Sequence, residues 1–142
     1  MTVIAELGVD MRVFPTVAHA AAWAGVCPGN NESAGKRMGQ QKRRGNVHLC
    51  SALVQAAFGA SRTKNTNFKA RFWKIAGRAG KKRAAVAIAH GILKAIYQML
   101  NAGAAYKDLG GDYLDRYVSR HVEQRLVHRL RSMGYEVHLK TA

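Results

Sequence analysis

A basic, glycine-rich segment at residues 29–37 carries the side chains with the most evident chemical use in this 142-residue sequence. It reads GNNESAGKR, so Ser33 is followed closely by a lysine and an arginine. A serine hydroxyl becomes a nucleophile when a base takes its proton and positive groups stabilise the group under attack. Glu32 and His48 are candidates for that base. Turns also favour serine, and from composition alone a turn residue in a solvated loop is the favoured interpretation of Ser33.

The same segment does not match a nucleotide-binding phosphate loop. That loop has four residues between its glycines, and a serine or threonine that binds magnesium follows its lysine. Here five residues separate Gly29 from Gly35, and Arg37 follows Lys36. We therefore reject a nucleoside triphosphatase.

The positive charge of the chain is concentrated in one block. The sequence has 23 Lys and Arg against 8 Asp and Glu, which gives a net charge of +15. Residues 33–107 contain 16 of these cations and no carboxylate, so the block cannot be the centre of a carboxylate-based enzyme. A block of this kind favours a polyanion as partner, and nucleic acid is the simplest one.

Two parts of the block are candidates for phosphate binding. One is the loop over residues 33–46, whose glycines let a ligand approach the backbone and whose last residue begins a helix. The other is the segment 62–83, where nine cations are interleaved with aromatic residues that we expect mainly in the core. The candidate nucleic-acid-binding residues are Lys36, Arg37, Lys42, Arg43, Arg44, Asn46, Lys69, Arg71, Lys74, Arg78, Lys81, Lys82 and Arg83.

No spacing of histidine or cysteine indicates a metal site. His121 and His128 are seven residues apart, too far for the i, i+4 pair of zinc-binding helices. Cys27 and Cys50 lack the spacing of metal ligands, and two such cysteines suit a reducing cytoplasm, where we expect the protein. No apolar run is long enough to cross a membrane.

Hydrophobic periodicity predicts a mostly α-helical single small domain with a long basic glycine-rich loop and a short C-terminal strand. One helix ends near Gly8, and Thr16 caps a second helix that ends at Gly25. The segment 26–46 is rich in glycine and has no periodicity, which is typical of a loop. Further elements are expected as helices at about 47–62, 67–78, 84–101 and 113–133, and as a strand at 135–140.

The two longest expected helices carry apolar stripes that we expect to face the core. The stripe of the 84–101 helix consists of Ala85, Ile88, Ala89, Ile92, Ile96 and Met99. Its opposite side carries His90, Lys94, Gln98 and Asn101. The stripe of the 113–133 helix consists of Leu114, Val118, Val122, Leu126 and Leu130.

Several short motifs follow one another along the chain in a recognisable order. They are VCPGNNESAGKR at 26–37, RGN at 44–46 followed by Leu49, GKK at 80–82, YKDLGGDY at 106–113 and LRSMGYEV at 130–137. In this order they resemble the C-terminal transposase domain of the bacterial DEDD-plus-serine insertion-sequence transposases, the "one-ten" group. That family is related to pilin-gene invertases and is guided by a bridge RNA. The resemblance extends over nearly the whole chain.

The resemblance implies a function for the serine. In that family the serine of a Pro-x4-Ser loop attacks the DNA backbone and joins covalently to it, and the matching residues here are Pro28 and Ser33. It also implies that the arginines of the loop neutralise phosphates, and that Gly45 and Asn46 shape the loop and start the supporting helix.

The sequence departs from the family's pattern in two respects. Cys50 takes the place of an arginine, and we expect the family's N-terminal RuvC-like domain, whose four acidic residues bind magnesium, to be missing from this chain. We therefore expect residues 1–142 to be a truncated serine domain that is inactive alone. Within it, 1–25 would be the remnant of a helix-hairpin-helix-like segment and 113–142 a helix–strand tail.

The implied partners follow from the same resemblance. They are DNA, a guide RNA, and a second copy of the chain or an intact transposase, with no membrane. We expect no cofactor in this chain and magnesium only with the acidic domain. The alternative function is a non-catalytic basic module that binds nucleic acid.

Overall fold

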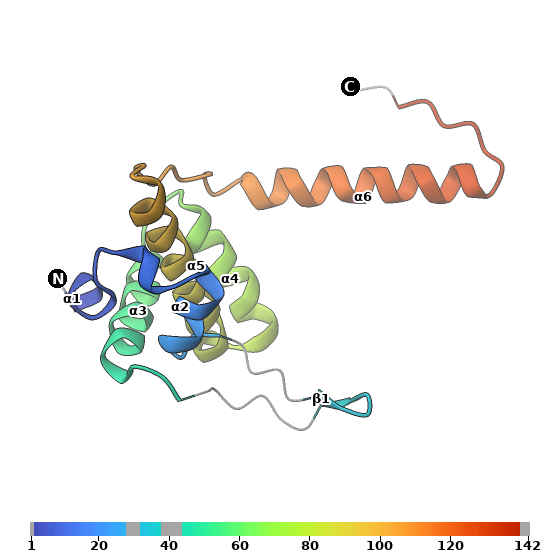
Figure 1. Ribbon diagram of the computed structural model, residues 1–142. Helices are drawn as coiled ribbons and strands as arrows, with labels where there is room; N and C mark the ends of the chain where they lie inside the picture. Colours follow the sequence, from blue (N-terminus) through green and yellow to red (C-terminus); the bar gives the residue numbers. More distant parts are fainter. Residues whose placement is uncertain (1, 28–31, 38–43, 140–142) are drawn as a thin grey trace.

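The computed structural model describes residues 2–27, 32–37 and 44–139. Helices α1 (Thr2–Leu7), α2 (Val17–Trp23), α3 (Val47–Ala60), α4 (Asn67–Ala79) and α5 (Lys81–Ala102) form one packed body. A short 3-10 helix, η1 (Met11–Val13), lies between α1 and α2, and α6 (Tyr113–Ser132) extends away from the body (Figure 1). The expectation of a mostly α-helical single domain is confirmed.

Capping residues set the helix boundaries. The Oδ1 of Asn46 accepts a hydrogen bond from the Leu49 amide at 2.9 Å, which satisfies one of the free amides at the start of α3. Gly103 ends α5 with a φ of 62°, in the left-handed region that glycine adopts readily. The expected bounds are confirmed to within a few residues, and the main difference is that α5 begins at Lys81 instead of residue 84.

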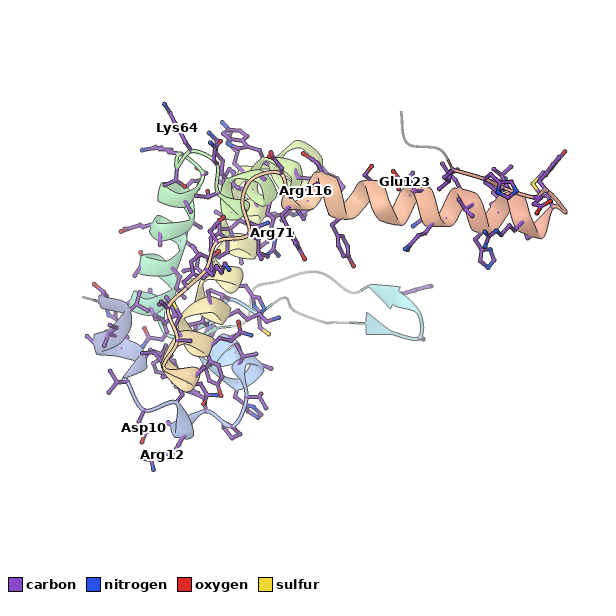
Figure 2. All side chains as sticks on the ribbon, turned by 90° about the horizontal axis from the view of Figure 1, so that it is seen from above. Asp10, Arg12, Lys64, Arg71, Arg116 and Glu123 are labelled. Carbon is purple, nitrogen blue, oxygen red and sulfur yellow. The ribbon has the colours of Figure 1, made fainter. Side chains whose placement is uncertain are left out.

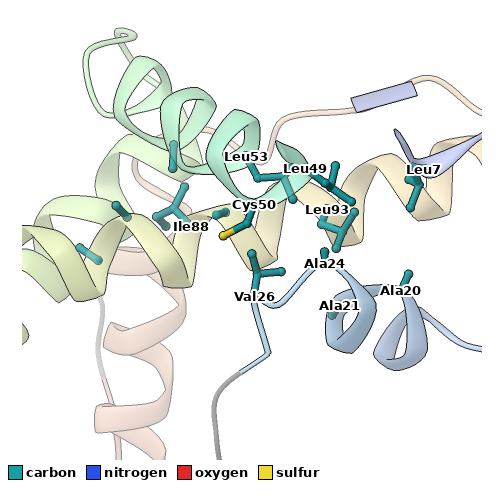
Figure 3. Close-up of a cluster of buried hydrophobic side chains, with 14 of the residues drawn as sticks. Leu7, Ala20, Ala21, Ala24, Val26, Leu49, Cys50, Leu53, Ile88 and Leu93 are labelled. Atoms are coloured by element: carbon teal, nitrogen blue, oxygen red, sulfur yellow. The ribbon is translucent and has the colours of Figure 1, made fainter. Parts of the chain in front are cut away.

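The hydrophobic core lies where α1, α2, α3 and α5 meet (Figure 3). Leu49 and Leu53 of α3 pack there with Ile88 and Leu93 of α5, and all four side chains are fully buried. Burying one such side chain stabilises the fold by about 1.5–3 kcal/mol. Small residues on α2 and α5 let these helices come close, and those that are buried are Ala20, Ala21, Ala84, Ala85 and Ala89.

The stripe expected on α5 needs two corrections. Leu93 lies outside that stripe but is fully buried, because α5 is covered from more than one side. Met99, at the end of the stripe, is 37 % exposed because it lies in the last turn of α5, near the end of the packed body.

The burial expected for α6 is wrong. Val122, Leu126 and Leu130 are 46 %, 55 % and 41 % exposed, although the helix has the expected bounds. A step of four residues turns by about 400°, so a stripe built only of such steps drifts by roughly 40° each time. From Leu114 to Leu130 the drift reaches roughly 160°, and no single neighbouring surface can cover it. The Val118 side chain lies outside the described part of the chain.

The strand expected at residues 135–140 is also wrong. Residues 135–139 have no regular secondary structure, because no described segment pairs with them as a neighbouring strand would; the Tyr135 backbone N–H instead donates to the Leu130 carbonyl oxygen of α6 at 3.1 Å. Lys140 lies outside the described residues. The strands that the structure describes are instead β1 (Glu32–Ser33) and β2 (Lys36–Arg37), inside the expected long loop.

Candidate nucleic-acid interface

Ser33 lies in a small β-hairpin within the basic loop. The antiparallel register pairs Ser33 with Lys36 and Glu32 with Arg37. The turn between the strands consists of Ala34 and Gly35, whose φ angles of 50° and 75° are both positive. This is the pattern of a type I′ turn, whose twist matches that of the strands it joins. The backbone therefore sets the serine directly opposite a lysine.

The two ends of the basic loop meet at one place on the helical body. The backbone N–H of Asn46 donates a hydrogen bond to the Trp23 carbonyl oxygen at 2.9 Å. A Cβ atom on Gly45 would lie only 2.7 Å from that same oxygen and would also collide with the backbone of Gly25. Only glycine allows this approach, so the base of the loop is closed by backbone contact.

The Asn46 side chain fastens this base to two helices. Its Oδ1 caps α3, and its Nδ2 donates a hydrogen bond to Glu6 Oε2 of α1 at 2.7 Å. The closed base thus rests on α1, α2 and α3 together. Because both ends of the amide are already engaged within the protein, a nucleic-acid contact from Asn46 stays a prediction.

A second set of cations lies on α4 and at the start of α5. Arg71, Lys74 and Arg78 follow one another at i, i+3 and i+7, so they share one face of α4, and all three are exposed. Lys69, at a different angle on the helix, is half-buried. The first turn of α5 adds three exposed cations, which are Lys81, Lys82 and Arg83.

The charge of these cations is not neutralised within the described part of the chain. There, ion pairs join Asp10 to Arg12 and Glu136 to His138, and none reaches a cation of the block 33–107. Helix N-termini favour negative charge: the Asp108 carboxylate contacts the first amide of α4, whereas α5 has no acidic residue in its first turn. The three cations at the start of α5 even oppose the helix dipole, so an external anion would stabilise this surface.

The exposed aromatic Trp73 adjoins this cationic surface. Its Nε1 donates to the Ser61 carbonyl oxygen at 3.2 Å, and the Lys81 ammonium lies 5.7 Å from its ring centroid, within the range of a cation–π contact. Phe72 is buried and Phe68 is partly buried, as expected, whereas Trp73 is 50 % exposed.

The structure brings some predicted residues together and keeps others apart. Ser33 and Lys36 pair in the hairpin, which Figure 1 shows standing clear of α4 and α5, so the serine does not adjoin the helical cations. Lys42 and Arg43 lie outside the described residues. Cys50, where the resembling family has arginine, is buried in the core, so this position packs against the protein.

Neither a metal centre nor a membrane helix is present among the described residues. No three His, Cys, Asp or Glu side chains in that part of the chain come together as a metal site would require. None of its helices has the length and the apolar character needed to cross a membrane.

A comparison with protein-family models decides the family. The model described as Transposase IS116/IS110/IS902 family matches residues 1–72, which is half of the chain. The chain belongs to this transposase family. Searches of curated proteins and of solved structures found no match. The matched part of the transposase chain contains the Ser33 hairpin, the closed base of its loop and α3, while α5 and α6 lie beyond the match.

Sequence reasoning missed a further group of polar residues in this transposase chain. Asn67 of α4, His90 of α5 and Tyr106 line one groove, although they are far apart in the sequence. The available signal was the polar side of α5, where His90, Lys94 and Gln98 recur at every fourth position and all line that groove.

Proposed function

We propose that this transposase chain supplies the serine nucleophile of a DNA strand-transfer reaction and the cations that hold the nucleic-acid backbone. The observation that carries the proposal is the hairpin, which pairs Ser33 with Lys36 on a loop anchored to three helices. Membership of the transposase family supports it, since the family match includes this loop.

The proposed chemistry is a transesterification at a DNA phosphate. The Ser33 Oγ forms a bond to phosphorus, the bond from phosphorus to one sugar oxygen breaks, and that oxygen leaves with a proton. The Oγ proton passes to a base, for which Glu32 and His48 are the nearest candidates in the sequence. Lys36 would stabilise the negative charge that grows on the phosphate oxygens during the attack.

The proposed partners divide the remaining work. The cations of α4 and of the first turn of α5 would hold DNA or a guide RNA by its phosphates. An intact transposase would supply the acidic domain and its magnesium, and a second copy of this chain is a further proposed partner. The carboxylates of the described residues do not gather into a metal site, so no step proposed here passes through the metal.

Mapping of the covalent adduct tests the proposal. The chain would be incubated with target DNA, guide RNA, magnesium and the acidic domain of a family member, and the trapped adduct digested with trypsin. The peptide 13–36 contains Ser33 as its single serine, so mass spectrometry assigns the linkage directly. We expect a nucleotide on Ser33, and a nucleotide on any other residue would overturn the assignment.

A second candidate function is a non-catalytic module that binds nucleic acid. The unneutralised cations of the described residues favour it, because they need no chemistry to explain them. Binding should then weaken on the order of a thousandfold between about 50 and 200 mM salt, without strand cleavage under any condition. An affinity independent of salt would contradict both functions.

A further inference from the structure

A groove runs between α4, α5 and the segment that follows α5. Its volume is about 620 Å³, within the range of roughly 300–1,000 Å³ that small-molecule sites occupy. It is separate from the Ser33 hairpin and from the exposed cations at the start of α5, none of which lines it.

One wall of the groove is aromatic. The rings of Phe68 and Tyr106 are stacked, with centroids 5.7 Å apart and planes 16° from parallel. Gly91 of α5 makes room for Phe68, because a Cβ atom there would lie 3.2 Å from the phenyl ring. Tyr106 is 43 % exposed, so the aromatic pair is accessible to a planar group.

Two buried polar atoms of the groove lack a partner. Asn67 Nδ2 and His90 Nδ1 are buried and make no hydrogen bond with any described residue. Asn67 as a whole is only 5 % exposed. A buried polar group without a partner destabilises a fold, so such groups normally bind something. Both residues line the groove, while the two atoms themselves lie just beneath its surface, so a rotation of either side chain would present a hydrogen-bonding group to a ligand.

The rim of the groove is positively charged. Arg71, Lys94 and Lys107 line it and are exposed, and no carboxylate is among the lining residues. Asp108 lies next to the groove, but its carboxylate accepts hydrogen bonds from the Asn67 and Gly110 amides and from the Tyr106 hydroxyl. The three cations exceed the single negative charge of Asp108, so the rim favours a phosphate.

We infer that this groove binds one unpaired nucleotide of a nucleic-acid strand, with its base against Tyr106 and its phosphate at Arg71, Lys94 and Lys107. The aromatic wall matches the face of a base, the polar lining residues match its hydrogen-bonding edge, and the cations at the rim match the phosphate. The inference rests on the proposed binding of nucleic acid and deepens it, because it distinguishes an unpaired strand from a duplex. An acidic peptide would match the rim but would leave the aromatic wall unexplained.

The test compares short strands that differ only in their bases. Fluorescence anisotropy would measure the affinity of the full chain for single-stranded DNA, single-stranded RNA and an abasic DNA strand with the same phosphates. We expect the wild type to prefer base-bearing strands by about tenfold, as base–aromatic stacking predicts, and Tyr106→Leu to lose this preference. The DNA and RNA arms show which sugar the groove prefers. Equal binding of the abasic and the base-bearing strand by the wild type would overturn the inference.

A matched pair of charge reversals locates the binding. Lys94→Glu at the rim and Lys64→Glu outside the groove change the net charge equally, and both side chains are exposed. Figure 2 shows Lys64 at the far end of the body from α1. Lys94→Glu should weaken single-strand binding by at least about tenfold and Lys64→Glu much less. Equal losses of single-strand affinity in the two variants would contradict binding at this groove. Because duplex binding and the Ser33 adduct do not need the groove, both should persist in Tyr106→Leu, which separates a failure here from a failure of the proposed function.

Discussion

Helices α5 and α6 are similar in length, at 22 and 20 residues, yet one forms the centre of the body and the other leaves it (Figure 1). On α5, Ile88 and Leu93 are fully buried. On α6, Leu126 is 55 % exposed and the described side chains include none that is buried.

The difference lies in the spacing and size of the apolar residues. The α5 stripe combines steps of four and three residues, as from Ala85 through Ala89, Ile92 and Ile96 to Met99, which keeps it on one face, and its alanines allow neighbouring helices to come close. The α6 stripe uses only steps of four and winds around the helix. The comparison teaches that an apolar repeat predicts burial only when its average period matches the 3.6 residues of a helical turn.

Truncating one leucine on α5 and one on α6 should give the largest difference in the free energy of unfolding. Leu93→Ala removes a fully buried side chain and should lower the free energy of unfolding by about 2–5 kcal/mol. Leu126→Ala removes the same atoms from an exposed position and should change it by less than about 0.5 kcal/mol. Urea denaturation measures both. A loss of several kcal/mol in Leu126→Ala would show that α6 packs against the body after all.

The basic loop also leaves the body, but its base belongs to the core region. Gly45→Ala would force a methyl group onto the Trp23 carbonyl oxygen and the backbone of Gly25, and should lower the free energy of unfolding by about 1–3 kcal/mol. Gly77→Ala on α4 meets no atom within 4 Å, so it should raise stability by about 0.5–1 kcal/mol. Thermal melts of the two variants should therefore shift in opposite directions. A stable Gly45→Ala variant would mean that the base is open.

Asp108, in the segment between the body and α6, should make a smaller contribution to stability that depends on pH. Burial is the largest single influence on Asp108 and raises its pKa, but the three hydrogen bonds that its carboxylate accepts together outweigh it and lower the pKa below 3.8. The resulting stabilisation is fully present above the ordinary carboxylate pKa and is lost as the pH falls through the lowered value.

Asp108→Asn should accordingly flatten the fall in stability below about pH 4, measured by urea denaturation across that range. Asp112→Asn is the matched control, since the Asp112 side chain makes no capping hydrogen bond, and it should keep the wild-type slope. Identical slopes in the wild type and in Asp108→Asn would contradict the stabilisation by these hydrogen bonds.

Much of the helical body could be predicted from the sequence because its signals are local. Asn46 and Gly103 mark helix ends by capping chemistry that needs no tertiary contact. The hairpin could not be predicted, since its turn requires a positive φ at Ala34, which alanine rarely adopts.

The groove and the end of the chain depended on tertiary structure. The groove joins Asn67, His90 and Tyr106 across three segments, so its polar atoms become neighbours only after folding. The alternation at residues 135–139 is typical of a strand, but a strand forms only where a second strand can pair with it. Hydrophobic periodicity shows which side chains of a segment share a face, but it does not show which other segment packs against or pairs with that face.

The central claim is that Ser33 is the nucleophile, and a pair of serine variants tests it most directly. The covalent protein–DNA adduct would be measured on denaturing gels for the wild type, for Ser33→Ala and for Ser51→Ala, which changes an exposed serine on α3. Each reaction would contain target DNA, guide RNA, magnesium and the acidic domain of a family member. DNA binding would be measured in parallel. We predict an adduct in the wild type and in Ser51→Ala, and none in Ser33→Ala despite unchanged DNA binding. An adduct that persists in Ser33→Ala, or its absence from the wild type, would contradict the claim.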